Sequence, residues 1–156
     1  MDSTDILINI RKIVRSINLE SKRIQKDYGV SIPQVLCLNY LYKSPNFQAT
    51  QGEVKQFLNL NPSTVSGIIQ RLEKKALIAR LPKIGDKRVT NLVLTATGEN
   101  LLRQIPPLLH DRLNTKLERI DQDELKMIEQ VLEQLVDILQ ISDVEASPLI
   151  TNEIEL

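Results

Sequence analysis

Three cationic side chains surround one Gly-Asp pair near the middle of the chain. Lys83, Lys87 and Arg88 flank Gly85-Asp86 between two apolar runs. Cationic side chains gathered on a turn can form charge-assisted hydrogen bonds with phosphate oxygens. A carboxylate two residues before an arginine can also hold the guanidinium in one direction. We therefore expect this stretch to contact a phosphate backbone, and the alternative is a solvated loop.

The charge along the chain supports a phosphate partner, although the formal net charge of the 156 residues is zero. Residues 50–95 carry eight basic and three acidic groups, whereas residues 117–156 carry two basic and eleven acidic groups. A nucleic acid meets the local field rather than the total charge. Aromatic residues make up only 3% of the chain, which argues against a stacking platform for single strands.

Catalytic and metal-binding patterns are missing from the sequence. The only histidine, His110, cannot belong to a metal site built on a histidine pair. On a predicted helix it points in a different direction from Asp111, because neighbouring helical residues do not face each other. There is no glycine-rich phosphate loop and no G-x-S-x-G motif. We expect no enzyme, no metal and no cofactor.

Cys37 is the only cysteine, which excludes an internal disulfide and agrees with a reducing compartment. It lies between Leu36 and Leu38, with no basic residue near it in sequence to lower the pKa of its thiol. We interpret Cys37 as a buried structural thiol. A redox role for it is the alternative.

Two further patterns concern the surface of the C-terminal part of the chain and the cellular location of the protein. Glu129, Glu133 and Asp137 recur every four residues, which is typical of a solvated helix face. No apolar run approaches the roughly 20 residues needed to cross a bilayer. The first residues, MDSTDILINIRK, lack the pattern of a signal peptide. We expect a cytoplasmic protein with no membrane partner.

Amphipathic helices precede the cationic stretch. Isoleucines recur at helical spacing from Ile6 to Ile24, which predicts a long helix over residues 4–26. A second helix is predicted from Ser31, a capping residue, to about Lys43.

The next two helices are short. Thr50-Gln51-Gly52-Glu53 has the form of a capping box, and its helix ends near Leu58. Asn61 and Pro62 then open a fourth helix with apolar residues on one face and polar residues on the other. Two short helices joined by a tight turn indicate a helix-turn-helix, and ordinary core helices are the alternative.

Strands and further helices follow. Residues 76–80 and 89–94 predict two β-strands around Gly85-Asp86, which makes the cationic stretch the tip of a hairpin, or wing. A helix over residues 95–120 must be bent or interrupted at Pro106-Pro107. A last helix begins at Asp121 and carries a coiled-coil seam from Leu125 to Leu139. The predicted fold class is mainly α with a small β-hairpin wing (α+β).

Taken together, these features make the chain resemble the MarR-type winged helix-turn-helix transcriptional regulators. The resemblance rests on STVSGIIQRLEKKALI over residues 63–78, on Arg80, on the D-x-R of Asp86 and Arg88, and on the L-T-x-x-G that ends at Gly98. Two positions depart from the family. Ala76 stands where glycine is usual, so we expect the helix before it to end differently or to bear strain. Leu81-Pro82 replaces a frequent second basic residue, which puts phosphate contacts at the start of the wing in doubt.

The resemblance implies four parts: an N-terminal dimerisation helix (1–30), a winged helix-turn-helix DNA-binding unit (31–98), C-terminal dimerisation helices (99–141) and an acidic tail (142–156). It implies a homodimer whose terminal helices intertwine and which binds double-stranded DNA at a palindromic operator. The alternative is a monomer in which the terminal helices cover the central unit.

Site residues follow from the resemblance and from their places on the helix and hairpin. Polar side chains of the fourth helix would face base edges or phosphates, Gly67 would allow close approach, and Arg88, oriented by Asp86, would enter the minor groove. The predicted DNA-binding residues are Ser63, Thr64, Ser66, Gly67, Gln70, Arg71, Lys74, Arg80, Lys83, Asp86, Lys87 and Arg88.

The resemblance also implies an effector. Many relatives bind small aromatic or phenolic acids between the terminal helices and the DNA-binding unit, and the residues predicted for such a site are Arg15, Tyr28, Tyr40 and Tyr42. The expected function is sequence-specific regulation of transcription, as a repressor relieved by this effector. The alternatives are a winged-helix protein-interaction module and a redox-responsive regulator acting through Cys37.

Overall fold

Seven α-helices and a small sheet make up the described part of the chain. The structure is a computed structural model that describes residues 2–144 and 146. The elements, in chain order, are α1 (Thr4–Tyr28), α2 (Ile32–Lys43), the short 3-10 turn η1 (Pro45–Phe47), β1 (Gln48–Thr50), α3 (Gln51–Leu58), α4 (Pro62–Lys74), β2 (Ile78–Arg80), β3 (Asn91–Leu94), α5 (Ala96–Gln104), α6 (Leu109–Leu117) and α7 (Gln122–Leu139).

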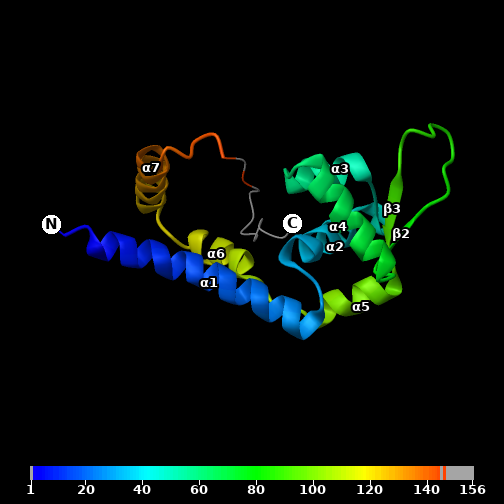
Figure 1. Ribbon diagram of the computed structural model, residues 1–156, viewed down its shortest axis with the longest axis horizontal. Helices are drawn as coiled ribbons and strands as arrows, with labels where there is room; N and C mark the ends of the chain where they lie inside the picture. Colours follow the sequence, from blue (N-terminus) through cyan, green and yellow to red (C-terminus); the bar gives the residue numbers. More distant parts are fainter. Residues whose placement is uncertain (1, 145, 147–156) are drawn as a thin grey trace.

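The core lies around α2, whose residues 32–38 are all buried. Helices α3 and α4 and strand β3 pack against α2 and bury their own apolar residues there. The sheet is antiparallel in the order β1-β3-β2. Figure 1 shows these elements as one lobe, from which the loop between β2 and β3 projects. This arrangement confirms the predicted fold class.

The predicted helix starts are confirmed at atomic detail. Ser31 Oγ accepts from the Gln34 backbone N–H at 3.3 Å, and Gln34 Oε1 accepts from the Ser31 backbone N–H at 3.2 Å. Thr50 and Glu53 form the same reciprocal pair at 3.0 and 2.8 Å. Asn61 caps α4 through a 2.9 Å bond from the Ser63 backbone N–H. Each cap satisfies backbone donors that the helix itself leaves without partners.

The sheet differs from the prediction in two respects. The hairpin strands are shorter than residues 76–80 and 89–94, because β2 and β3 pair only over Ile78–Arg80 and Leu92–Leu94. Pro82 lacks a backbone donor and cannot extend the ladder, so residues 81–90 form a loop. The strand β1 was not predicted, since three residues are too few to show an alternating pattern.

Ala76 carries the strain that its departure from the family pattern predicts. Its backbone φ is 57°, in the left-handed region. The Leu77 N–H bonds to the Leu72 carbonyl at 3.0 Å and the Ala76 N–H to the Glu73 carbonyl at 2.9 Å, which is the Schellman ending of a helix. The helix α4 therefore ends in the conformation that glycine adopts most easily, at the cost of a Cβ in an unfavourable conformation.

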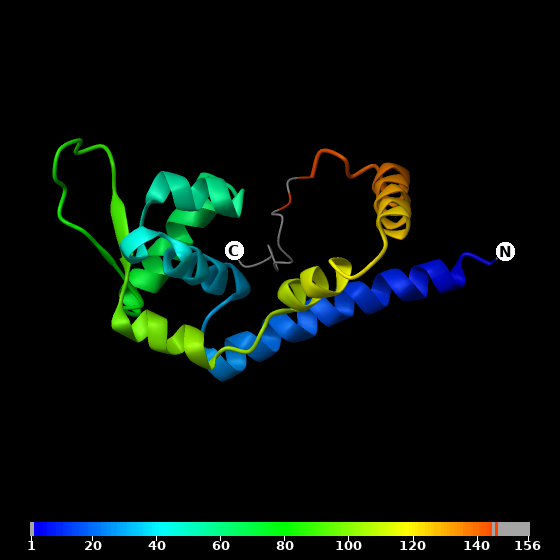
Figure 2. The same cartoon turned by 180° about the vertical axis from the view of Figure 1, so that it is seen from behind.

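The helices at the two ends of the chain extend away from the central lobe. Pro106-Pro107 interrupts the predicted helix over residues 95–120, which becomes α5 and α6. Figures 1 and 2 show α6 lying along α1. The two are joined where the buried Glu20 carboxylate accepts the Leu109 N–H at 2.8 and 3.0 Å. Most of the predicted acidic tail, residues 142–156, lies outside the described residues.

The described residues contain neither a helix that could span a membrane nor a cluster of potential metal ligands. None of the helices in this part of the chain is long and apolar enough to span a bilayer. Within the same residues, no group of three or more His, Cys, Asp or Glu side chains could hold a metal ion.

Gly98 provides a test of the packing between α5 and the strand that precedes it. A Cβ at Gly98 would overlap the Leu77 carbonyl oxygen and approach Leu94 Cδ1 at 2.7 Å. We expect Gly98→Ala to lower the free energy of unfolding by about 1–3 kcal/mol, the usual cost of overpacking. Chemical denaturation at one protein concentration measures this change.

Gly52→Ala is the matched control for Gly98→Ala. A Cβ at Gly52 would meet only Thr50 Oγ1, at 3.8 Å, and alanine favours a helix by up to about 1 kcal/mol over glycine. This variant should be as stable as the parent or more so. Equal denaturation midpoints for the two variants would contradict the packing described here.

Candidate nucleic-acid interface

The helix α4 has one buried face and one exposed polar face. Val65, Ile68, Ile69 and Leu72 are buried in the core. Of the residues predicted to bind DNA from this helix, Ser63, Thr64, Gln70, Arg71 and Lys74 are exposed, while Ser66 and Gly67 are half-buried. The hydroxyl of Ser63 donates to the capping Asn61 at 2.8 Å, so its orientation is set before any ligand is bound.

The fold itself does not require a glycine at position 67. A Cβ there would meet only the Arg71 guanidinium, at 3.7 Å. Glycine inside a helix costs about 0.5–1 kcal/mol relative to alanine. The packing of α4 therefore leaves its outer surface open at this position.

The wing loop over residues 81–90 holds its arginine in a defined direction. Arg88 donates to both carboxylate oxygens of Asp86, from Nε at 3.1 Å and from Nη2 at 3.2 Å. The backbone N–H of Arg88 also donates to Asp86 Oδ1, at 3.0 Å, and closes a turn between the two residues. The side-chain bond from Arg88, and then the backbone bond, lower the pKa of Asp86. The pairing predicted from the D-x-R spacing is present.

A further ion pair anchors the base of the wing to α4. Arg80 Nε donates to Glu73 Oε2 at 2.7 Å. Sequence reasoning assigned Arg80 to DNA and gave no role to Glu73, because a pair that joins a helix to the following strand leaves no periodic signal. Farther out, Lys83 Nζ donates to the Lys87 carbonyl at 2.9 Å and closes the loop across its two arms.

The four residues predicted for an effector site do not come together. Arg15 lines a groove on the exposed side of α1, and Tyr28 lines a separate pocket at the end of that helix. The Tyr40 ring stacks on Phe57 at 4.6 Å between ring centroids, and the Tyr42 ring on Phe47 at 5.5 Å. Each ring has a local packing partner or its own pocket, so the described residues form no common site from this set.

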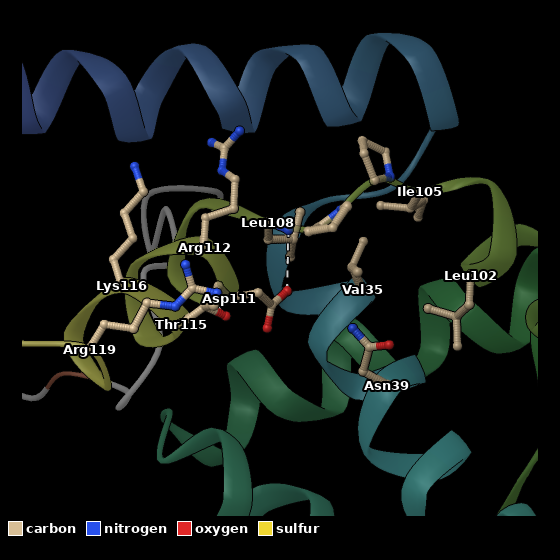
Figure 3. Close-up of a pocket in the computed structure, with 12 residues that line it drawn as sticks. Val35, Asn39, Leu102, Ile105, Leu108, Asp111, Arg112, Thr115, Lys116 and Arg119 are labelled. Carbon is tan, nitrogen blue, oxygen red and sulfur yellow. Dashed lines mark hydrogen bonds between the residues drawn. The ribbon is translucent and has the colours of Figure 1, made fainter.

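A different cavity, of about 650 Å³, opens between the central lobe and α6. Figure 3 shows Val35 and Asn39 of α2 on one side and side chains of α6 on the other. Most of its lining comes from residues 102–119, but sequence reasoning missed it because the opposite wall, on α2, lies far away in the chain. The lining residues are Val35, Asn39, Leu102, Ile105, Pro106, Pro107, Leu108, Asp111, Arg112, Thr115, Lys116 and Arg119.

His110 corrects one expectation. Its Nε2 lies 3.2 Å from Asp111 Oδ1, although neighbouring helical residues were expected to point apart. The reason is the helix start: the Asp111 carboxylate turns back to accept the Leu108 N–H at 3.2 Å, which brings it towards the imidazole. The Nδ1 atom of His110 is buried with no hydrogen-bond partner among the described residues.

Cys37 is fully buried, as its apolar neighbours predict. Burial raises the pKa of the thiol to about 12. The thiolate is the reactive form, so a redox role for Cys37 has no support in this structure.

The fold and the exposed helix-and-wing surface define a winged helix-turn-helix protein. Residues 28–89 match the model of the MarR family. The HTH-type transcriptional regulator YsmB of Bacillus subtilis is 27% identical over 131 residues, which cover 84% of this chain and 88% of YsmB. The repressor MdtR of the same organism is 30% identical over 96 residues, covering 62% of this chain and 61% of MdtR.

Solved structures show the same fold. The MepR–DNA complex of Staphylococcus aureus superposes with a TM-score of 0.64 at 22% identity, covering 83% of this chain and 95% of MepR. The MarR family regulator Sco3205 of Streptomyces coelicolor, in complex with DNA, gives a TM-score of 0.62 at 21% identity over 94% of this chain and 97% of Sco3205. The chain therefore has the winged helix-turn-helix fold and is similar to MarR family transcriptional regulators, with the family match itself over residues 28–89.

The burial of Cys37 leads to a test by alkylation. With a pKa of about 12 the folded protein holds almost no thiolate at pH 9, whereas an exposed cysteine of pKa near 8.5 is mostly ionised there. We expect iodoacetamide at pH 9 to leave the folded chain unmodified while it alkylates the chain unfolded in guanidinium completely, as read by mass spectrometry. Rapid alkylation of the folded protein would show that the thiol is accessible.

Proposed function

We propose that this regulator binds double-stranded DNA in a sequence-specific manner, as a repressor that a small-molecule effector releases. The observation that carries the proposal is the exposed polar face of α4 beside a wing whose Arg88 is oriented by Asp86. The relatives MdtR, YetL of Bacillus subtilis and MprA of Escherichia coli are named repressors, which supports that direction of regulation. A DNA-binding regulator works beside the chromosome, so a cytoplasmic location is part of the proposal.

The helix α4 would lie in the major groove. Ser63, Thr64 and Gln70 carry hydroxyl and amide groups that reach base edges, and the exposed Arg71 and Lys74 contact phosphates. The half-buried Ser66 and the bare Gly67 mark the line of closest approach.

The wing would reach the adjacent minor groove. Arg88 enters the groove in the direction that Asp86 sets, while Lys83 and Lys87 contact the backbone on either side. Arg80 attracts phosphates less strongly, because its ion pair with Glu73 partly neutralises its charge.

A homodimer is part of the proposal, because both terminal helices expose apolar faces. On α1 these include Ile13 and Leu19, 57% and 55% exposed, and on α7 they include Leu132 and Leu139, 51% and 54% exposed. Monomeric proteins rarely leave contiguous apolar faces of this kind in water. A two-fold dimer would present two copies of α4 to a palindromic operator.

The charges beside these faces are complementary. The groove on α1 is lined by Ile10, Arg11, Val14, Arg15, Asn18, Leu19 and Lys22. The groove on α7 is apolar and rimmed by Glu129, Glu133 and Asp137, which are all exposed, as their spacing predicts for a solvated face. The α1 groove of one copy fits the α7 groove of the other in both polarity and sign of charge.

The effector would bind in the cavity between the lobe and α6. Arg112, Lys116 and Arg119 line it together with apolar side chains from α2 and from the linker after α5. An aromatic or phenolic acid matches this combination, because its ring takes the apolar wall and its anionic group takes the cations. A ligand in this cavity would contact both the DNA-binding lobe and α6, so its binding would change how the two are placed relative to each other.

Arg88→Ala tests the DNA-binding proposal. We expect a loss of affinity for a selected operator duplex of roughly tenfold or more, in line with about 1–3 kcal/mol for a specific arginine contact. Gel-shift titration measures the affinity, and the melting temperature should not change because the Arg88 side chain is 91% exposed.

The matched control is Arg103→Ala. Arg103 is also an exposed arginine in an ion pair, with Glu99 at 2.7 Å, but it lies on α5 away from the wing. Its removal should leave operator binding unchanged.

Binding of the parent protein should also fall steeply between low and high salt, as displacement of counterions requires, whereas an interaction module with an apolar partner would respond little.

The cavity is tested with a panel of benzoic and phenolic acids. At least one acid should raise the melting temperature and release the operator at similar concentrations, since it binds the folded protein. Lys116→Ala should weaken that acid about tenfold or more, as loss of a charged partner does. Lys126→Ala, on α7, should have no effect. If no acid of the panel binds, the effector part of the proposal fails while DNA binding stands.

A further inference from the structure

One apolar side chain stands alone at the tip of the wing. Ile84 is 87% exposed, more than any other large hydrophobic residue that the structure describes. It directly precedes Gly85, whose φ of 80° turns the chain at the tip. The other highly exposed apolar residues lie mainly on α1 and α7, where the proposed dimer accounts for them.

The loop does not need Ile84 to hold its shape. The hydrogen bonds that organise it run from Leu81 N to the Asn91 carbonyl, from Lys83 Nζ to the Lys87 carbonyl, and between Arg88 and Asp86. None of them involves Ile84, and a polar residue would serve the folded chain equally well. Single exposed apolar residues are common on protein surfaces, and what distinguishes Ile84 is the set of residues around it.

Those neighbours are cations on both sides. Lys83 adjoins Ile84 in sequence, and Lys87 and Arg88 follow on the other arm of the loop. If the cations bind the phosphates that border a minor groove, the tip between them faces the floor of that groove. The floor is built from sugar rings and base edges, which offer apolar surface to a branched side chain.

We propose that Ile84 is a specificity-determining residue of the wing, whose side chain enters the minor groove beside Arg88 and packs against sugars and base edges. The inference rests on the proposed DNA binding. Apolar side chains of this kind widen the groove and partly unstack the bases beside it. Pyrimidine–purine steps such as TA and CA deform most easily. Ile84 therefore favours operators that place such a step under the wing, without any hydrogen bond to a base.

The experiment compares Ile84→Ala, Ile84→Leu and Lys87→Ala with the parent chain. Each protein selects duplexes from a library, and binding to the parent's preferred duplex is titrated over a range of salt concentrations. We expect Ile84→Ala to bind about tenfold more weakly, with an unchanged slope of log affinity against log salt, because no phosphate contact is lost. It should also lose the preference for pyrimidine–purine steps under the wing, and Ile84→Leu should retain both properties.

Lys87→Ala is the matched control from the other arm of the loop, because the carbonyl of Lys87 and not its side chain takes part in the hydrogen bond with Lys83. It should reduce the salt slope by about one and keep the step preference, because it removes a phosphate contact and not an apolar one. Equal affinity and equal selected sequences for Ile84→Ala and the parent would overturn the inference, and so would a changed salt slope with the step preference intact. A parent protein that selects no duplex would refute the proposed function instead, and that result involves no variant.

Discussion

The burial of the apolar stripe of α4 against the core around α2 is the interaction on which the rest of the molecule depends. Val65, Ile68, Ile69 and Leu72 leave almost no surface to solvent. Once they are buried, helical geometry commits the opposite face, with Thr64, Gln70 and the following cations, to the outside. The same packing fixes where α4 ends, and hence where the wing begins.

Ion pairs then orient the arginine side chains on the outer surface. Glu73 holds Arg80 where the strand leaves α4, and Asp86 holds Arg88 near the tip. Surface ion pairs add little stability, so their contribution here is orientation. A guanidinium that is already directed loses less side-chain entropy when it meets a groove than a free one would. In the proposed interface, Glu73 and Asp86 would therefore contribute to recognition by orienting the two arginines.

Several features lay within reach of sequence reasoning and others did not. The caps at Ser31, Thr50 and Asn61 were predictable because each involves residues within three positions of one another. The Asp86–Arg88 pair was predictable for the same reason. The four effector residues share no pocket among the described residues, and an aromatic ring gives no local sign of whether its partner is a ligand or another ring. The rings of Tyr40 and Tyr42 both stack on phenylalanines.

Local patterns were enough to predict the helices, their amphipathic faces, the break at Pro106-Pro107 and the cationic turn, because periodicity, capping and proline chemistry act over a few residues. Long-range packing sets the pairing of β1 with β3, the Glu20 contact with the start of α6 and the cavity lined by α2 and α6. Glu20 and Leu109 are 89 positions apart in the chain. Contacts across such distances depend on how whole elements pack, and no local pattern records that.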